Sequence, residues 1–187
     1  MDKRYHDTDD AELLQRYCDG DAEAFTELYL RHRTPLFSYL RLHALGTEAE
    51  ALYRAAWMKA IDTREEPLGS GGFVERLFRI AHGLVSEAAR EGAPAWGDVE
   101  PRELAAAEDR LRDITQRSRG RALRVRRALG QLPDAQRESF LLYVTGGLPL
   151  PSVAAVEDEE VHVAMQRMQL ALRALRNGIE PTAAEKA

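Results

Sequence analysis

The period of the apolar residues limits this chain to helical folds. Apolar side chains recur at intervals of three and four along almost every segment, and no segment shows the strict alternation of a half-buried strand. In residues 73–90, one helical face would carry Phe73, Leu77, Ile80, Ala81, Leu84 and Val85. The pattern predicts an all-α protein.

The N-terminal half is divided into helices by polar caps and breakers. Side-chain oxygens at residues 8–10 and at Asp21 can cap the first two helices. Pro35 should kink or interrupt the second helix, because proline lacks a backbone donor. Thr47 and Glu50 have the spacing of a capping box at the start of the third helix. The predicted helices cover residues 11–18, 22–45, 48–61 and 73–90.

A different arrangement of helices follows residues 91–101, which are rich in glycine, proline and acid and are typical of a linker. A helix begins near Asp134 and stops at Gly146, and a short helix comes next. A long helix then extends from about Asp158 to Gly178. This order is typical of a helix-turn-helix, whose long last helix meets DNA.

The last helix has an apolar face and a polar face. Its apolar stripe, predicted to be core, consists of Val161, Ala164, Met165, Met168, Leu172 and Leu175. Glutamine and arginine on the other face could contact base edges or phosphates, although a solvated helix face could carry them equally well. This polar face consists of His162, Gln166, Arg167, Gln169, Arg173 and Arg176.

Composition excludes several classes of protein. A net charge of −5 and a pI near 5.6 argue against a generally basic nucleic-acid coat protein. A single cysteine, Cys18, excludes an intramolecular disulfide and a cysteine-based zinc cluster, and the five histidines have no ligand spacing. No catalytic set, metal site, cofactor motif or membrane-spanning segment is recognisable, so we expect a cytoplasmic protein that is not an enzyme.

The C-terminal half resembles region 4 of bacterial sigma-70-family factors, especially the small extracytoplasmic-function (ECF) group. That family's pattern is an alanine-leucine pair, Leu-Pro, a Gln-Arg-Glu triplet, an apolar helix, a Gly-Leu turn and a short helix. The chain has Ala128-Leu129, Leu132-Pro133, Gln136-Arg137-Glu138, Gly147-Leu148 and Ser152-Val153-Ala154 at the matching places.

The N-terminal half resembles region 2 of the same family. Residues 10–32 are similar to its opening, and Ala49-Glu50 with Leu52 sits where the family's clamp-binding helix begins. The stretch 73–81 is similar to the family's Phe-x-x-Trp-Leu-x-x-Ile-Ala. The two motif sets occur in the family's order, with a linker between them.

The resemblance implies a fold, a set of domains and a function. It implies a four-helix region 2 domain at 1–91, a flexible linker at 92–117, a helix-turn-helix region 4 domain at 118–178 and a disordered tail at 179–187. The chain would be a sigma factor that directs core RNA polymerase to promoters by recognising their −10 and −35 elements. Its partners would be the polymerase clamp and flap, promoter DNA and an anti-sigma factor, with no direct membrane insertion.

The same resemblance assigns residues to these partners. The loop 63–72 would read −10 bases. The polymerase-binding residues would be Glu50, Leu52, Tyr53 and Arg54, and the DNA-binding residues would be Ser152, His162, Gln166, Arg167, Gln169 and Arg173.

The chain departs from the family at several of these positions. In region 2, Ala51 replaces an acidic residue, Arg54 a glutamine and Arg76 a tryptophan, and in region 4 the family's Leu-Gly turn becomes Glu157-Asp158. Four acids at 157–160 would repel phosphate near the start of the last helix. An alternative function is therefore a degenerate sigma-like regulator that acts through protein contacts without specific DNA binding.

Overall fold

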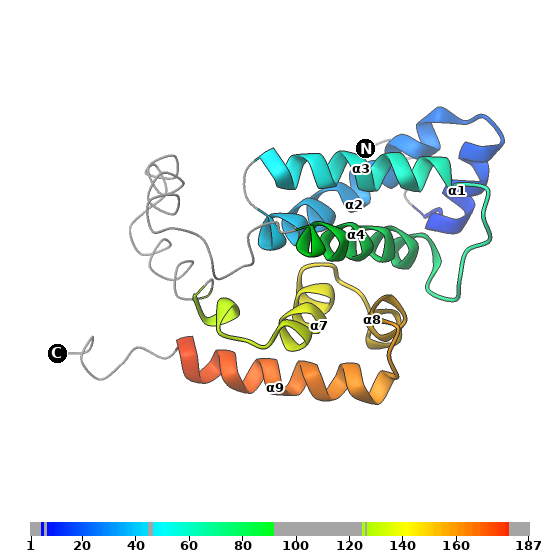
Figure 1. Cartoon of the computed structure of the whole chain (residues 1–187). Helices are drawn as coiled ribbons and strands as arrows, with labels where there is room; N and C mark the ends of the chain where they lie inside the picture. Colours follow the sequence, from blue (N-terminus) through cyan, green and yellow to red (C-terminus); the bar gives the residue numbers. More distant parts are fainter. Residues whose placement is uncertain (1–4, 6, 45–46, 92–124, 126, 180–187) are drawn as a thin grey trace.

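All the secondary structure in the described part of the chain is helical, as the apolar period predicted. The computed structural model describes residues 5, 7–44, 47–91, 125 and 127–179. The predicted linker and residues 180–187 of the predicted tail lie outside these residues, so the domain bounds remain a prediction. The helices are α1 (Asp10–Cys18), α2 (Ala22–His43), α3 (Thr47–Asp62), α4 (Gly72–Arg90), α7 (Asp134–Val144), α8 (Leu150–Glu157) and α9 (Val161–Ile179) (Figure 1).

The predicted caps start the first two helices. The Asp9 carboxylate accepts a hydrogen bond from the Glu12 N–H at 2.8 Å, and the Asp21 carboxylate accepts one from the Glu23 N–H at 3.1 Å. These bonds satisfy donors that have no partner within their own helix. Helix α2 continues through Pro35 without the interruption that the sequence allowed.

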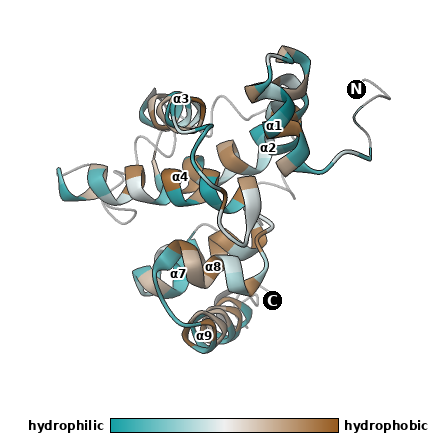
Figure 2. Ribbon diagram, turned by 90° about the vertical axis from the view of Figure 1, so that its right-hand side faces the viewer, coloured by the Kyte–Doolittle hydropathy of each residue, from teal (hydrophilic) through white to brown (hydrophobic). Residues whose placement is uncertain are grey.

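Helix α4 lies at the centre of the molecule. Helices α1, α2 and α3 pack on one side of it, and α8 packs on the other side (Figure 2). One continuous core of buried residues joins both halves, from Leu13 of α1 through Phe78 of α4 to Leu175 of α9. The two halves therefore form a single packed unit in this structure.

The turn between α8 and α9 corrects the predicted start of the last helix. Asp158 has a left-handed backbone, with φ at 56°, so it ends α8 and cannot belong to the next helix. The carbonyl of Glu160 accepts hydrogen bonds from the amides of Val163 and Ala164, which begin α9. Helix α9 starts at Val161; Glu157 ends α8, and the acidic residues 158–160 form the turn between the two helices.

The apolar stripe of α9 is only partly core. Ala164, Met168 and Leu175 are buried as predicted, and Ala171 joins them. Three other members of the stripe remain about half exposed because α7 and α8 cover only a narrow strip of α9. These are Val161, Met165 and Leu172, which are 46%, 44% and 52% exposed.

None of the helices that the structure describes is both long and apolar enough to cross a bilayer.

The turn at Asp158 can be tested by unfolding. Replacing Asp158 with alanine should lower the free energy of unfolding by about 1 to 2 kcal/mol, because alanine lacks the short polar side chain that helps aspartate adopt a left-handed backbone. Asp158→Gly removes the same carboxylate but adopts that backbone freely, and it should stay within about 0.5 kcal/mol of the wild type. Urea denaturation of both variants measures the difference, and equal losses would contradict the backbone explanation.

Candidate functional site

Four of the predicted DNA-binding residues form an exposed row on α9. His162, Gln166, Gln169 and Arg173 follow one another at intervals of four, three and four, and all are exposed. This spacing places their side chains on one face of the helix. The structure therefore brings these four residues together on a surface that a DNA groove could approach.

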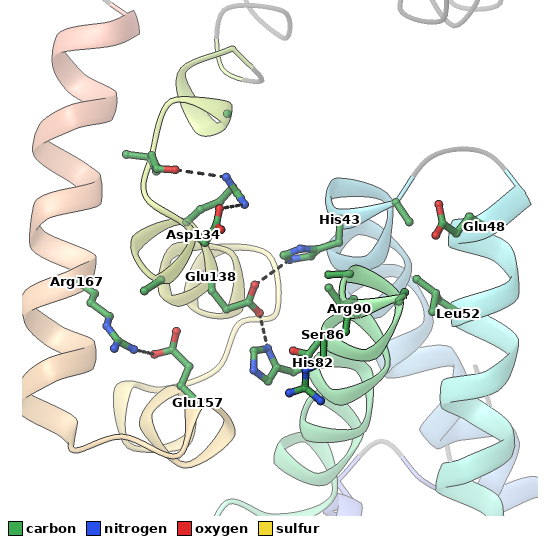
Figure 3. A pocket seen from close by; sticks show the side chains of 18 residues that line it. His43, Glu48, Leu52, His82, Ser86, Arg90, Asp134, Glu138, Glu157 and Arg167 are labelled. Carbon is green, nitrogen blue, oxygen red and sulfur yellow. Dashed lines mark hydrogen bonds and ion pairs between the residues drawn. The ribbon is translucent and has the colours of Figure 1, made fainter. Parts of the chain in front are cut away.

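Arg167 differs from this row because its guanidinium group points back toward the turn. Its Nη2 lies 2.6 Å from Glu159 Oε1, and its Nη1 lies 3.5 Å from Glu157 Oε2. Figure 3 shows the contact between Arg167 and Glu157, whose side chain is only 4% exposed. Arg167 thus holds the turn together as well as standing at a predicted DNA position.

Glu157 joins the three C-terminal helices. It ends α8, it accepts a hydrogen bond from the Ser139 hydroxyl of α7 at 2.8 Å, and it pairs with Arg167 of α9. Burial raises the pKa of Glu157, while the hydrogen bond from Ser139 and the charge of Arg167 oppose that rise. No sequence motif signalled this role, since the three residues are far apart in the chain.

The acidic turn is therefore partly paired within the protein. Glu157 is buried and paired, Glu159 pairs with Arg167, and the Glu160 carboxylate lies 3.0 Å from His162 Nδ1. The Glu160 pair is exposed on both sides. Fewer free charges face the start of α9 than the sequence alone suggested.

Ser152 lies away from the exposed row. It is 4% exposed at the start of α8, where α8 meets the first turn of α4. A Cβ on Gly71 would come within 2.6 Å of the Ser152 hydroxyl oxygen. In this conformation, the N-terminal helices cover the position that the sequence assigned to DNA.

Three of the four predicted polymerase-binding residues surround a hollow between α2 and α3. Glu50, Tyr53 and Arg54 line a cavity of about 450 Å³. Burial and a hydrogen bond with Tyr29 raise the pKa of Tyr53 to about 12, so its hydroxyl remains protonated. Leu52 lies apart from them and lines a second cavity, between the two halves of the chain. From α2, the hollow is lined by Tyr29, Arg33, Thr34, Phe37 and Ser38.

The loop between α3 and α4 is attached to α4 by Arg76. Its guanidinium group donates hydrogen bonds to the carbonyl of Thr63, at 2.8 Å, and to the carbonyl of Glu66. The family that the chain resembles has tryptophan at the position of Arg76. In this chain an aromatic ring is therefore replaced by a side chain that hydrogen-bonds to the loop. Gly72, with φ at 70°, then turns the chain into α4.

Comparisons with known proteins cover both halves of the chain. No protein-family model matches it. It is 26% identical over 184 residues to the ECF RNA polymerase sigma-E factor of Escherichia coli (strain K12), which covers 92% of this chain and 95% of that protein. The ECF RNA polymerase sigma-E factor of Shigella flexneri gives the same values. The chain is thus similar to ECF sigma factors along nearly its whole length.

A solved structure agrees with this assignment at the level of the fold. It is the structure of CnrH in complex with the cytosolic domain of CnrY, with a TM-score of 0.68 and 22% identity. The match covers 90% of this chain and 95% of that one. Helices α1 to α4 lie in the part of the chain that resembles region 2, and α7 to α9 lie in the part that resembles region 4. The part of the chain that the structure describes contains no group of three or more His, Cys, Asp or Glu that could hold a metal ion.

The contacts of Arg167 change the expected result of its substitution. From the place of Arg167 on the polar face of α9 alone, Arg167→Ala would be expected to weaken DNA binding with little effect on the fold. The structure instead predicts a loss of about 1 to 3 kcal/mol in the free energy of unfolding, because the buried Glu157 carboxylate would lose a charged partner. Arg173→Ala, on the same helix and exposed, should change stability by less than about 0.5 kcal/mol. If Arg167→Ala and Arg173→Ala lower thermal stability equally, Arg167 has no special structural role.

Proposed function

We propose that this sigma factor binds core RNA polymerase through region 2 and directs it to promoters through contacts with the −10 and −35 elements. The observation that carries the proposal is the match to an ECF sigma factor along both halves of the chain, at 92% coverage. Each half also presents a separate surface suited to its part of the task. Nothing in the comparisons favours a regulator without DNA recognition.

The hollow between α2 and α3 is the proposed polymerase contact. The Phe37 and Tyr53 rings meet edge to face, with their centroids 5.3 Å apart, and Arg33, Arg54 and Glu50 surround them. Aromatic and arginine side chains together are typical of residues that contribute most to protein binding. This composition supports the assignment of Glu50, Tyr53 and Arg54, whereas Leu52 does not line the hollow.

The exposed row of α9 is the proposed −35 contact. Glutamine can bond two adenine atoms at once, and arginine can do the same with guanine or can bind phosphate. Gln166, Gln169 and Arg173 supply these groups from one face, and His162 lies at the start of the helix. The pairing of Arg167 with Glu157 and Glu159 gives it a positioning role, in which it fixes the turn from which the reading helix departs.

The proposal extends to the −10 element and to partners. We assign the −10 bases to loop 63–72, which Arg76 ties to α4. The structural neighbour CnrH is bound by the cytosolic domain of CnrY. We propose that an anti-sigma protein binds this chain in a comparable way. A protein that binds core polymerase and promoter DNA acts where the chromosome lies, which is consistent with the predicted cytoplasmic location.

Two assays with core polymerase test the function. The chain should co-purify with core polymerase and should support promoter-dependent run-off transcription. Arg54→Glu should reduce co-purification at least roughly tenfold, because it reverses a charge in the proposed contact. Lys59→Glu makes the same charge change on an exposed part of α3 outside the hollow, and it should leave co-purification intact. Polymerase binding without any promoter-dependent transcript would support the protein-contact alternative instead.

The remaining acids of the turn should limit DNA affinity. Changing both Glu159 and Glu160 to glutamine should strengthen binding to −35 DNA by about fivefold per charge, since each carboxylate near phosphate costs about 1 kcal/mol. It should also steepen the dependence of affinity on salt. Fluorescence anisotropy with a duplex carrying only the −35 element measures both quantities. Glu87→Gln removes one exposed carboxylate of α4 as a control, and an equal change per charge would place the turn away from phosphate.

A further inference from the structure

The loop between α3 and α4 is held by side chains from two other elements. Its residues 63–72 follow the end of α3 and run beside α1 before they enter α4 (Figure 1). From α1, the Cys18 thiol donates a weak hydrogen bond to the carbonyl of Arg64 at 3.7 Å. The Arg64 guanidinium lies 5.9 Å from the centroid of the Tyr17 ring, also of α1. The remaining contacts come from the first two turns of α4.

Arg76 of α4 fixes the first turn of the loop through both of its terminal nitrogens. The Thr63 carbonyl accepts hydrogen bonds from the Glu66 amide at 3.0 Å and from Arg76 Nη1 at 2.8 Å. The Glu66 carbonyl accepts a hydrogen bond from Arg76 Nη2. One guanidinium group therefore joins the two ends of a single turn. A rigid fork of donors suits this task, whereas an indole has one donor and an ammonium is a point charge on a flexible stem.

Glu75, the preceding residue of α4, supports the second half of the loop. Its side chain is buried and pairs with Arg79 at 3.0 Å. A Cβ on Gly71 would lie 1.8 Å from Glu75 Oε2, and a Cβ on Gly69 would lie 3.5 Å from Oε1. The backbone of the loop thus passes directly over this carboxylate, and the glycine at 71 provides the space.

These contacts engage the backbone of the loop and leave its outer side exposed. The carbonyls of residues 63, 64 and 66 are already bonded to Arg76 or to Cys18. A glycine-rich loop loses conformational freedom when a ligand orders it, and that loss weakens binding. A loop that the protein orders beforehand avoids the loss. The exposed residues are Glu65, Glu66, Pro67, Gly69 and Ser70.

We propose that Arg76 is a positioning residue for DNA recognition, which holds residues 63–66 in the conformation that receives an unpaired base. The recognition part of this assignment rests on the proposed −10 role of loop 63–72. The order that Arg76 imposes on the loop depends only on the contacts described above. The two parts can therefore fail separately in an experiment.

Hydrogen exchange of the full chain without DNA tests the order of the loop. Arg76→Met keeps the length of the side chain and removes both donors. The Glu66 amide, which closes the turn, should then exchange at least roughly tenfold faster, because the two hydrogen bonds that fix its turn are lost. Amides within α3 should keep their wild-type rates. If the Glu66 amide exchanges equally fast in both proteins, the proposal is wrong.

Binding to single-stranded DNA tests the role of that order. The probe is a fluorescent single strand selected from a random pool for binding to the wild-type chain. Arg76→Met should bind it at least roughly tenfold more weakly, because the loop must be ordered again on binding. Faster exchange at Glu66 with unchanged affinity would refute the positioning role and would leave Arg76 as a structural contact.

The salt dependence of the same binding distinguishes positioning from direct contact. The slope of log affinity against log salt should be the same for Arg76→Met and wild type, because no phosphate contact is lost. Loss of one phosphate contact would make the slope shallower by about 0.7 for a single strand. A shallower slope in Arg76→Met would therefore overturn the proposal in favour of direct binding.

Matched variants separate the tie from charge and from folding. Arg76→Trp restores the residue of the family that the chain resembles, and it should behave like Arg76→Met in both assays. Arg76→Lys should recover part of both losses, because its ammonium can still donate to one carbonyl. Arg90→Met removes the same charge at the exposed far end of α4 and should match wild type.

Circular dichroism should show unchanged helix content in all of these variants. If Arg76→Met loses helix, Arg76→Lys alone decides the result, and a wild-type exchange rate at Glu66 in that variant would refute the tie. If the wild-type chain selects no sequence from the pool, the proposed −10 role of the loop fails, and the positioning role fails with it. The exchange result would still stand as evidence of an ordered loop.

Discussion

The buried carboxylate of Glu157 is the interaction on which the C-terminal domain depends. It lies where α7, α8 and α9 meet, and Ser139 and Arg167 satisfy it from two different helices. A buried charge is costly unless it is paired and hydrogen-bonded, so the three helices are constrained to the positions that supply those partners. The helix-turn-helix frame and the direction in which α9 leaves the turn both follow from this constraint.

The same constraint explains how an acidic turn can occur in a DNA-reading domain. Two of its carboxylates form ion pairs with the Arg167 side chain, so these charges stabilise the fold in the absence of DNA. Arg167 is thereby engaged within the protein, whereas the row from His162 to Arg173 stays exposed as the proposed recognition surface.

Local features of the sequence predicted the helices, but they could not predict contacts across the chain. The caps at Asp9 and Asp21 depend on neighbouring residues and were found where the pattern placed them. The start of α9 was misplaced because the left-handed backbone at Asp158 leaves no periodic signal. The apolar stripe was overestimated as core, since periodicity gives the direction of a face and not the width that other helices cover. Met165, on that stripe, is 44% exposed.

For the candidate site, too, the sequence predicted which helices carry the residues but not their contacts with distant parts of the chain. The resemblance selected α9 and α3, and the structure places most of the chosen residues on shared surfaces. The resemblance could not reveal that Ser152 is covered or that Glu138 contacts His82, because these contacts join segments more than fifty residues apart. Such contacts depend on how the two domains pack, and neither domain's own pattern encodes that packing.

The two carboxylates of region 4 also link the domain contact to the reading helix. The charge of Glu138 raises the pKa of Glu157, and the charge of His82 lowers it, although burial remains the largest influence. Glu157 in turn holds Arg167, so the contact between the two halves and the turn before α9 are joined by a series of adjacent charged side chains.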